Sequence, residues 1–207
     1  MIDILIERYP CLSYCESEIS KAAKELIACF EKGGKLLLCG NGGSAADCEH
    51  ISGELMKGFL RKRPLSEKTK AQLKSLCPES AEFTHKLQCG LPAVCLSSMT
   101  SLNTAFSNDE DSKLVYAQGV FALGRESDVL LCLSTSGNAE NVLFAAKTAK
   151  ALGLKVISLS GRDGGKLKDF SDICICVPES ETFKIQELHL PVYHCLCAMT
   201  EEYFFKD

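Results

Sequence analysis

The feature that most constrains the fold is a unit that the chain contains twice: an almost wholly apolar run, a loop of small polar residues and then a helical pattern. Run, loop and helical pattern cover residues 35–39, 40–44 and 45–59 in the first copy, and residues 129–133, 134–138 and 139–152 in the second. Strands without polar positions are buried on both faces, which is typical of parallel sheets covered by helices. The chain is therefore predicted to be an α/β protein.

Further elements of the same kind extend this sheet. The other predicted strands and helices are strands 93–96, 156–159 and 173–177 and helices 12–30 and 181–203. We expect one doubly wound α/β domain over residues 1–207, with a parallel sheet sandwiched by helices and an N-terminal helical segment at 1–34. Residues 62–91 interrupt the pattern, are rich in basic residues and hold one short helical candidate at 66–76. They are predicted to be a surface insertion, with a basic lid or partner surface as the alternative.

Composition and charge narrow the class of protein. The net charge of −4 argues against a nucleic-acid partner, so we expect a small ligand. No apolar run is long enough to span a membrane, and charges interrupt the first residues too early for a secretory signal, so we expect a cytoplasmic protein without a membrane partner. Most of the thirteen cysteines lie in apolar runs, which predicts reduced, buried thiols.

Both loops are suited to bind an anion. Each passes from a strand into a helix, where backbone N–H groups and the helix dipole favour negative charge. The polar and glycine positions that would contact phosphate oxygens are Asn41, Gly42, Gly43, Ser44, Ser134, Thr135 and Ser136. Helix capping is the alternative for either loop alone. Two such loops at the carboxyl ends of strands in one sheet favour a ligand site, because open α/β sheets bind ligands at that edge.

A dinucleotide site is a further alternative for the first loop. Residues 40–45 match the G-x-G-x-x-A pattern. A dinucleotide fold also needs a second strand that ends in an acidic residue about twenty residues later. At that distance the chain has Arg61, Lys62 and Arg63 and no strand. The sequence therefore argues against a nicotinamide cofactor.

A second group of candidates combines imidazole, carboxylate and amide side chains. His50 and Glu54 are four residues apart, so they project from one face of a helix. The other members lie on the last predicted helix: Gln186, Glu187, His189 and His194. Such a set can hold a zinc ion. The alternatives are an exposed pair for His50 and Glu54 and a core or surface position for His189.

The spacing on the last helix limits how such an ion could be shared. Gln186 and His194 are separated by about 12 Å along a straight helix. Both can reach one ion only with long side chains, with a bent helix or from different subunits. Pro191 lies between them and lacks the N–H that would bond to Glu187, so a kink is expected there.

Four stretches together resemble the phosphoheptose isomerases, a family with the sugar isomerase (SIS) fold. They are residues 39–47 (CGNGGSAAD) with His50 and Glu54, residues 133–138 (LSTSGN), residues 160–166 (SGRDGGK), and residues 185–189 (IQELH) with His194. The resemblance covers nearly the whole chain outside the predicted insertion. It implies a flavodoxin-like SIS fold. It also implies an aldose–ketose isomerase that converts sedoheptulose 7-phosphate to D-glycero-D-manno-heptose 7-phosphate through a zinc-assisted enediolate.

The resemblance also implies roles for individual residues. Carried over by position, it implies one zinc ion per subunit at His50, Glu54, Gln186 and His194. The sugar phosphate contacts that it implies are Asn41, Gly42, Gly43, Ser44, Glu54, Asn108, Asp109, Ser134, Thr135, Ser136 and Gln186. It further implies a homotetramer with active sites at subunit interfaces, in which the N-terminal helix helps assembly. Because isomerisation needs a base and an acid, we assign Glu54 as the base and His194 as the partnering acid.

Three positions depart from the family pattern. Ala139 stands where a phosphate-binding serine is common, Gly58 where an arginine near the substrate is usual, and Met99 where aspartate is common. These changes affect substrate fit more than the chemistry, so an isomerase for a different sugar phosphate is one alternative. Another is a non-catalytic SIS module that binds sugar phosphates or, as in one bacterial branch, acts as the partner of a replication initiator.

Overall fold

The centre of the protein is a five-stranded parallel sheet. The computed structural model describes residues 1–206. Its strands are β1 (Leu36–Cys39), β2 (Ala93–Cys95), β3 (Val129–Leu133), β4 (Lys155–Gly161) and β5 (Ile173–Val177), in the order β2-β1-β3-β4-β5. The strand order reverses between β1 and β3, which pair in parallel with Leu37 opposite Leu130. Such a switch point opens a crevice at the carboxyl ends of the two strands, which is where the two glycine and serine loops begin.

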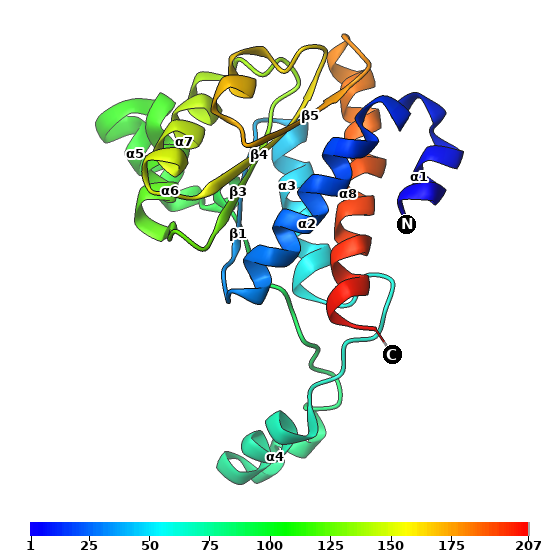
Figure 1. Ribbon diagram of the computed structural model, residues 1–207. Coiled ribbons are helices and arrows are strands. Elements are labelled where there is room, and N and C mark those ends of the chain that lie inside the picture. Colours follow the sequence, from blue (N-terminus) through cyan, green and yellow to red (C-terminus); the bar gives the residue numbers. More distant parts are fainter. Residues whose placement is uncertain (207) are drawn as a thin grey trace.

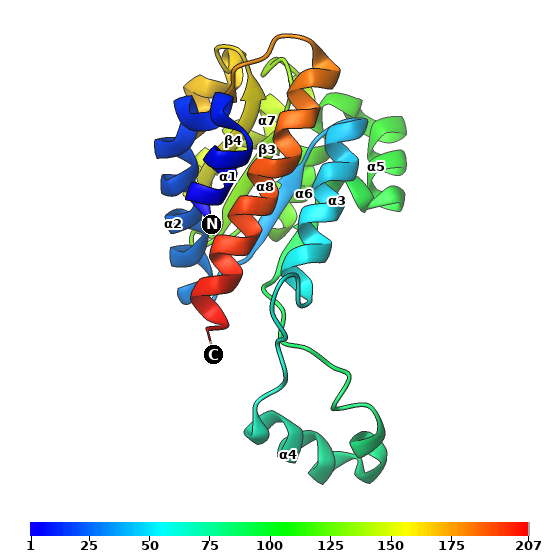
Figure 2. The same cartoon turned by 90° about the vertical axis from the view of Figure 1, so that its right-hand side faces the viewer.

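Helices cover both faces of the sheet (Figures 1 and 2). One face carries α1 (Ile2–Arg8), α2 (Glu16–Glu31), α3 (Gly43–Met56) and α8 (Thr182–Phe204), and the other carries α5 (Thr100–Phe106), α6 (Val115–Leu123) and α7 (Glu140–Ala151). Successive strand residues alternate between the two cores: Leu36 and Leu38 pack towards α2 and α8, whereas Leu37 and Cys39 pack towards α6 and α7. The predicted doubly wound α/β sandwich is confirmed.

Of the helices predicted at 12–30 and 181–203, the first begins later than predicted and the second runs over almost the predicted residues. The helix predicted at 12–30 is α2 preceded by a 3-10 turn, Pro10–Cys15. The last helix, α8, continues through Pro191 without a break. The loss of one backbone hydrogen bond there does not end the helix, because its buried face packs against α2 and α3.

Residues 62–91 lie largely outside the layers of the fold (Figures 1 and 2). They contain α4 (Glu67–Leu76), which has no buried residue, and a 3-10 turn, Pro78–Glu82. The two ends of the segment meet where Pro64 pairs with Gln88 and the Cys89 N–H donates to the Arg63 carbonyl at 2.7 Å. The segment therefore leaves and re-enters the domain at one place, as an insertion would. Within the described residues no helix is long and apolar enough to cross a membrane.

All thirteen cysteines are free thiols. Eight of them are buried, and Cys39, Cys48 and Cys132 have no exposed surface. Burial raises the pKa of Cys15, Cys29 and Cys195 to about 11, so these thiols stay protonated and uncharged. Most of the cysteines therefore serve as small apolar side chains of the core, as their sequence context predicts.

Candidate active site

The first loop passes from β1 directly into the first turn of α3. Gly42 has a φ of +55°, which an L side chain rarely adopts. A Cβ on Gly43 would lie 2.6 Å from Gln186 Nε2, so glycine at this position lets the Gln186 amide reach the loop from α8. Ser44 is almost completely buried, with 3% of its surface exposed. The first loop is thus a tight helix N-terminus with an amide side chain against it.

Asn41 is held in place from the opposite face of the sheet. Its side-chain amide donates to Asn141 Oδ1 at 2.8 Å, and Asn141 donates back to Asn41 Oδ1 at 2.9 Å. The Tyr116 hydroxyl donates to the Gly40 carbonyl and lies 3.1 Å from Asn41 Oδ1. Because Asn141 belongs to α7, which follows the second loop, this amide pair ties the two loops together.

The second loop is braced by the segment that follows β4. Gly137 has a φ of +64°, and a Cβ there would lie only 1.9 Å from the Gly164 carbonyl oxygen. Asn138 Oδ1 accepts a hydrogen bond from the Lys166 N–H, and the Asn138 amide donates to the Ser136 carbonyl. The shape of the loop therefore depends on contact with residues 162–166.

The two loops share one cavity of about 370 Å³. Its lining residues are Asn41, Gly42, Gly43, Ser44, Leu133, Ser134, Thr135, Ser136, Ala139, Thr182 and Gln186. Hydroxyl and amide groups dominate this lining, and two helices, α3 and α7, begin beside it. Neutral donors at helix N-termini are suited to a phosphate group.

A carboxylate and two imidazoles form the second part of the site. His194 Nδ1 lies 2.7 Å and His50 Nε2 lies 3.3 Å from Glu54 Oε1. One ligand atom of each residue lies within 4.8 Å of the others. Glu54 is buried, with 5% of its surface exposed, whereas half of the His50 side chain is exposed. The structure thus brings together three of the four residues for which the resemblance implies a metal.

Two further residues orient His50. The Tyr193 hydroxyl lies 3.0 Å from His50 Nδ1 and donates to Asp47 Oδ1 at 3.3 Å. Burial, together with the Asp47 carboxylate, raises the pKa of Tyr193, so its hydroxyl keeps the proton that it donates. Tyr193 oxygen can then accept from His50 Nδ1–H, which leaves the lone pair of Nε2 facing Glu54. This arrangement is typical of a metal-binding histidine.

The donor set fits a divalent metal ion. Glu54 Oε2 is buried and makes no hydrogen bond among the described residues, whereas Glu54 Oε1 faces both imidazoles. Buried polar atoms without partners are costly in a folded protein. Two imidazole nitrogens and a carboxylate that leave positions open to substrate match catalytic zinc sites.

Gln186 lies with the loops rather than with this group. It precedes His194 by eight residues on the same helix, and its amide contacts Gly43 and lines the loop cavity. Of the two roles that the resemblance implies for Gln186, its position in this structure agrees with the substrate contact. Asn108 and Asp109 are exposed, in a short π-helical segment (Ser107–Asp111) that does not line the loop cavity.

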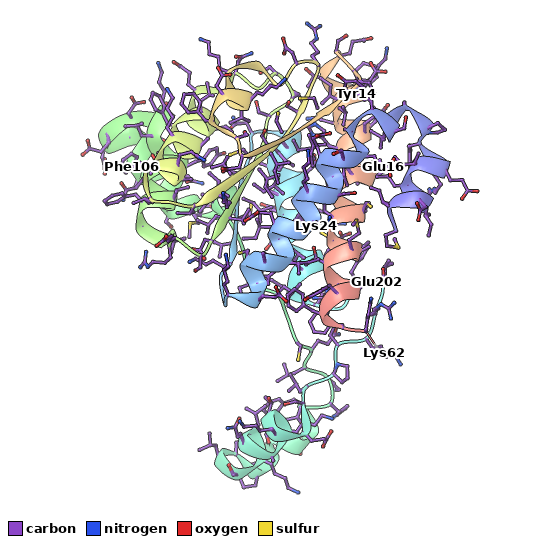
Figure 3. All side chains as sticks on the ribbon, viewed as in Figure 1. Tyr14, Glu16, Lys24, Lys62, Phe106 and Glu202 are labelled. Carbon is purple, nitrogen blue, oxygen red and sulfur yellow. The ribbon has the colours of Figure 1, made fainter. Side chains whose placement is uncertain are left out.

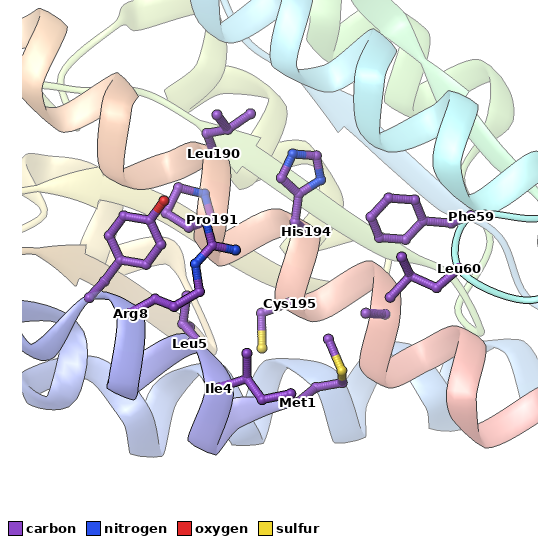
Figure 4. A pocket seen from close by; sticks show the side chains of 12 residues that line it. Met1, Ile4, Leu5, Arg8, Phe59, Leu60, Leu190, Pro191, His194 and Cys195 are labelled. Carbon is purple, nitrogen blue, oxygen red and sulfur yellow. The ribbon is translucent and has the colours of Figure 1, made fainter.

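An apolar cavity of about 400 Å³ adjoins the histidine group (Figure 4). It lies between α1 and α8 and includes Ile4, Leu60 and one side of His194. The Phe59 ring stacks on the His194 imidazole, with ring centroids 5.6 Å apart and planes inclined by 18°. Phe59 therefore limits the orientations that His194 can adopt.

A buried ion pair fixes the end of α3, which carries Glu54. Arg63 is 1% exposed, and its guanidinium donates to Glu201 Oε1 at 2.8 Å and to the carbonyls of Glu54 and Leu55. Glu201 also accepts from the Phe59 and Leu60 N–H groups. Burial opposes ionisation of Glu201, but these donors outweigh burial and hold the pKa of Glu201 below its usual value.

His189 lies in the core rather than in the site. It is 0% exposed, and burial lowers its pKa to about 4, against an opposing contribution from the Ser160 backbone. The sequence alternative of a core histidine is the one that the structure favours.

Stability is therefore expected to fall on acidification because of His189. Above pH 6.5 the His189 imidazole is mostly neutral in both the folded and the unfolded protein. Between pH 6.5 and about 4, the unfolded chain takes up the proton and the folded protein mostly does not. The free energy of unfolding should decrease by about 2 kcal/mol at pH 5. Urea unfolding at pH 7 and pH 5 measures this, and His189→Leu should lose less than the wild type. His85→Leu, at an exposed position, is the control, and equal pH dependence in all three proteins would contradict the assignment.

Sequence reasoning missed several residues that position the site. Tyr193 and Asp47 orient His50, whereas Arg63 and Glu201 fix the end of α3. Asp47 precedes His50 by three residues on one helix, which is a usable signal. The contacts of Tyr193 and Glu201 join residues more than 130 positions apart, for which a single sequence holds no signal.

Comparison with known proteins identifies the family of this fold. A family model described as the SIS domain matches residues 12–86 and 70–161. The phosphoheptose isomerase of Roseiflexus sp. (strain RS-1) is 38% identical over 185 residues, which are 89% of this chain and 81% of the relative. That of Helicobacter pylori (strain P12) is 39% identical over 193 residues, or 93% of this chain and 88% of the relative.

Solved structures agree with the sequence relatives. The phosphoheptose isomerase of Neisseria gonorrhoeae superposes with a TM-score of 0.76 at 33% identity, over 94% of this chain and 91% of that one. A phosphoheptose isomerase from Francisella tularensis gives a TM-score of 0.74 at 34% identity, over 90% of this chain and 86% of that one. The likeness therefore extends over the sheet, both loops and the last helix.

Proposed function

Because the chain belongs to the phosphoheptose isomerase family of SIS-domain proteins and is an aldose–ketose isomerase acting on a sugar phosphate, we propose that it converts sedoheptulose 7-phosphate to D-glycero-D-manno-heptose 7-phosphate. The observation that carries the proposal is the pairing of a polar loop cavity with a carboxylate flanked by two imidazoles. The cavity suits the phosphate, and the carboxylate group suits the proton transfer.

Zinc is the proposed cofactor, with one ion per subunit. His50, Glu54 and His194 would hold it, and Gln186, the fourth ligand that the resemblance implies, would have to turn from Gly43 towards them. When bound, the ion supplies electrophilic stabilisation of the substrate oxygens. The unpartnered Glu54 Oε2 supports a cation at this place.

Glu54 is proposed to carry the proton between the two carbons of the substrate. Its carboxylate is buried and held by its helix, so it is positioned and poorly solvated, as a general base requires. His194, at 2.7 Å from Glu54, is placed to exchange a proton with the substrate oxygen as the enediolate forms and collapses. Tyr193 and Phe59 keep the two imidazoles in the orientation that this exchange needs.

The phosphate is proposed to bind between the two loops. Asn41, Gly42, Gly43 and Ser44 would face it where the chain passes from β1 into α3, and Ser134, Thr135 and Ser136 from the loop between β3 and α7. Ala139 lines the same cavity where the family often has a serine. The cavity therefore has one hydroxyl donor fewer than is common in the family. For this reason a different sugar phosphate is the second candidate substrate. Asn108 and Asp109 stay proposed contacts of the sugar.

Removal of loop hydroxyls is expected to weaken substrate binding more than turnover. Thr135→Val combined with Ser136→Ala removes two neutral donors from a charged phosphate, and each such bond contributes about 1.5–3 kcal/mol. Because two such bonds are lost, we expect KM to rise roughly 10²–10⁴-fold, with kcat changed only a few-fold. Ser75→Ala, an exposed hydroxyl on α4, is the matched control. An unchanged KM in the double variant would place the phosphate elsewhere.

The cellular setting is proposed from the same family likeness. We infer a cytoplasmic homotetramer whose N-terminal helices take part in assembly, with active sites at subunit interfaces. Sedimentation of the purified protein tests the tetramer, and a monomer at micromolar concentration would overturn it.

The test of the substrate is a screen of purified, zinc-loaded protein against aldose and ketose phosphates with five to seven carbons, followed by NMR. Conversion of sedoheptulose 7-phosphate above all others is the expected result. Preferential conversion of a shorter sugar phosphate would establish the second candidate. Binding without conversion of any sugar would instead indicate a non-catalytic SIS module.

A further inference from the structure

We propose that Cys174 and Cys176 form a dithiol site that exchanges with small disulfides of the glutathione type, and that the resulting intra-strand disulfide weakens phosphate binding at the second loop. Both residues lie on β5, the edge strand of the sheet. Its cavity shares no lining residue with the phosphate cavity, and no part of the proposed isomerisation uses it.

The two sulfur atoms are already in contact. Side chains two residues apart on a strand project from the same face, and Cys174 Sγ lies 3.4 Å from Cys176 Sγ. From the rise of a strand, their Cα atoms are about 6.6 Å apart, which is near the upper end of the range that a disulfide spans. A bond between them is therefore possible but strained. Strained disulfides are easily reduced, as a reversible switch requires.

Small molecules can reach these thiols. Both cysteines are half-buried and line a cavity of about 590 Å³ together with Tyr14, Arg162 and Lys168. Figure 3 shows Tyr14 beside the end of β5, at the edge of the molecule. Cys39 and Cys132 provide an internal contrast, because their sulfur atoms are 3.7 Å apart but both residues are 0% exposed.

The environment also activates one thiol. The hydrogen bond from the Cys176 thiol lowers the pKa of Cys174 to about 6, against burial and with help from Ser158, Ser160 and Lys168. The same contact raises the pKa of Cys176, which keeps its proton. At neutral pH Cys174 is therefore the attacking thiolate and Cys176 the resolving thiol.

The exchange balances without a further reactant. The Cys174 thiolate attacks one sulfur of the small disulfide, the S–S bond breaks, and one small thiolate leaves and is protonated. Cys176 then loses its proton, and its thiolate attacks the Cys174 sulfur of the mixed disulfide and displaces the second small thiol. Two protein thiols are oxidised to one disulfide, and one small disulfide is reduced to two thiols.

Gly164 connects the dithiol to the phosphate loop. A Cβ on Gly164 would lie 2.9 Å from Cys174 Sγ and 3.2 Å from Cys176 Sγ, so the sulfurs lie directly against this residue. On its other side, the Gly164 carbonyl oxygen occupies the place that a Cβ on Gly137 would need. Formation of a bond shortens the sulfur separation from 3.4 Å to about 2.05 Å. Gly164, whose carbonyl packs against Gly137, should move when the two sulfur atoms approach each other.

The first experiment follows the chemistry alone. Reduced protein is incubated with oxidised glutathione, its remaining thiols are alkylated, and its peptides are mapped by mass spectrometry. We expect a disulfide within the peptide that contains Cys174 and Cys176. Cys176→Ser should stop at glutathione bound to Cys174, Cys174→Ser should give no disulfide there, and Cys39→Ser should behave as the wild type. The exposed Cys11 shows whether the oxidant has acted. If Cys11 has reacted but Cys174 and Cys176 are still free thiols, the proposed dithiol site is wrong.

The second experiment tests the coupling, which rests on the proposed phosphate site. Calorimetry measures the binding of sedoheptulose 7-phosphate to zinc-loaded protein before and after oxidation, and again after dithiothreitol. We expect at least fivefold weaker binding on oxidation, recovery on reduction, and no response in Cys176→Ser. Equal affinity of the mapped disulfide form and the reduced form would overturn the coupling. If neither form binds the sugar, the proposed substrate is wrong. The peptide map then still shows whether Cys174 and Cys176 form a disulfide.

Discussion

Glu54→Gln is expected to lower kcat by about 10²–10⁴-fold, the range that a general base contributes. The substitution keeps the shape of the side chain but removes the charge that faces two imidazoles at 2.7 and 3.3 Å. It also removes an anionic metal ligand, so bound zinc should fall in parallel. Steady-state kinetics with metal analysis of the same sample measures both effects.

Glu49→Gln is the matched control for this prediction. Glu49 lies on the same helix, is exposed, and accepts a hydrogen bond from the Ser98 hydroxyl rather than facing the histidines. Its substitution should leave kcat and zinc content unchanged. Wild-type activity in Glu54→Gln would remove Glu54 from the mechanism.

Arg63→Met is expected to lower the free energy of unfolding by about 3–5 kcal/mol, as removal of one partner from a buried ion pair does. Glu201 would remain charged at 1% exposure, and the carbonyls of Glu54 and Leu55 would lose their donors. Arg63→Lys should restore only part of the loss, because one ammonium group cannot reach all three acceptors in the directions of the guanidinium fork. Urea unfolding at pH 7 measures these differences.

Lys184→Met gives the contrast for Arg63→Met. Lys184 pairs with Glu181 at the surface, and both side chains are about half exposed. Such pairs contribute about 0–1 kcal/mol. If Arg63→Met were as stable as Lys184→Met, the buried pair would not hold the end of α3 as described.

The strands were the most predictable part of the fold. β3 and β5 begin and end at the predicted residues because continuous apolar runs bounded by polar loops leave little freedom in their limits. Helices α5 and α6 were not predicted, for opposite reasons. α5 has no buried residue and so no apolar stripe, whereas α6 is apolar almost all round and so has no polar face.

The candidate site was predictable where its chemistry is local. Both loops and the four-residue spacing of His50 and Glu54 are visible in the sequence. The structure places the loops at the switch point of the sheet and the His50 and Glu54 pair against His194 of α8. Arg63 shows the limit of such reasoning. In the sequence it belongs to a basic run that is predicted to be a surface insertion, but in the structure it is buried against Glu201, 138 residues away. A run of basic residues in a sequence therefore does not show which of them is buried in an ion pair.

The most direct test of the central claim is the interconversion of sedoheptulose 7-phosphate by purified protein after chelation and after return of one equivalent of zinc per chain. We predict that chelation abolishes conversion, that zinc restores it, and that His50→Ala and His194→Ala lose both the zinc and the activity. Undiminished conversion by the metal-free protein, or tight zinc binding by both histidine variants, would contradict a zinc-assisted isomerase with its metal at His50, Glu54 and His194.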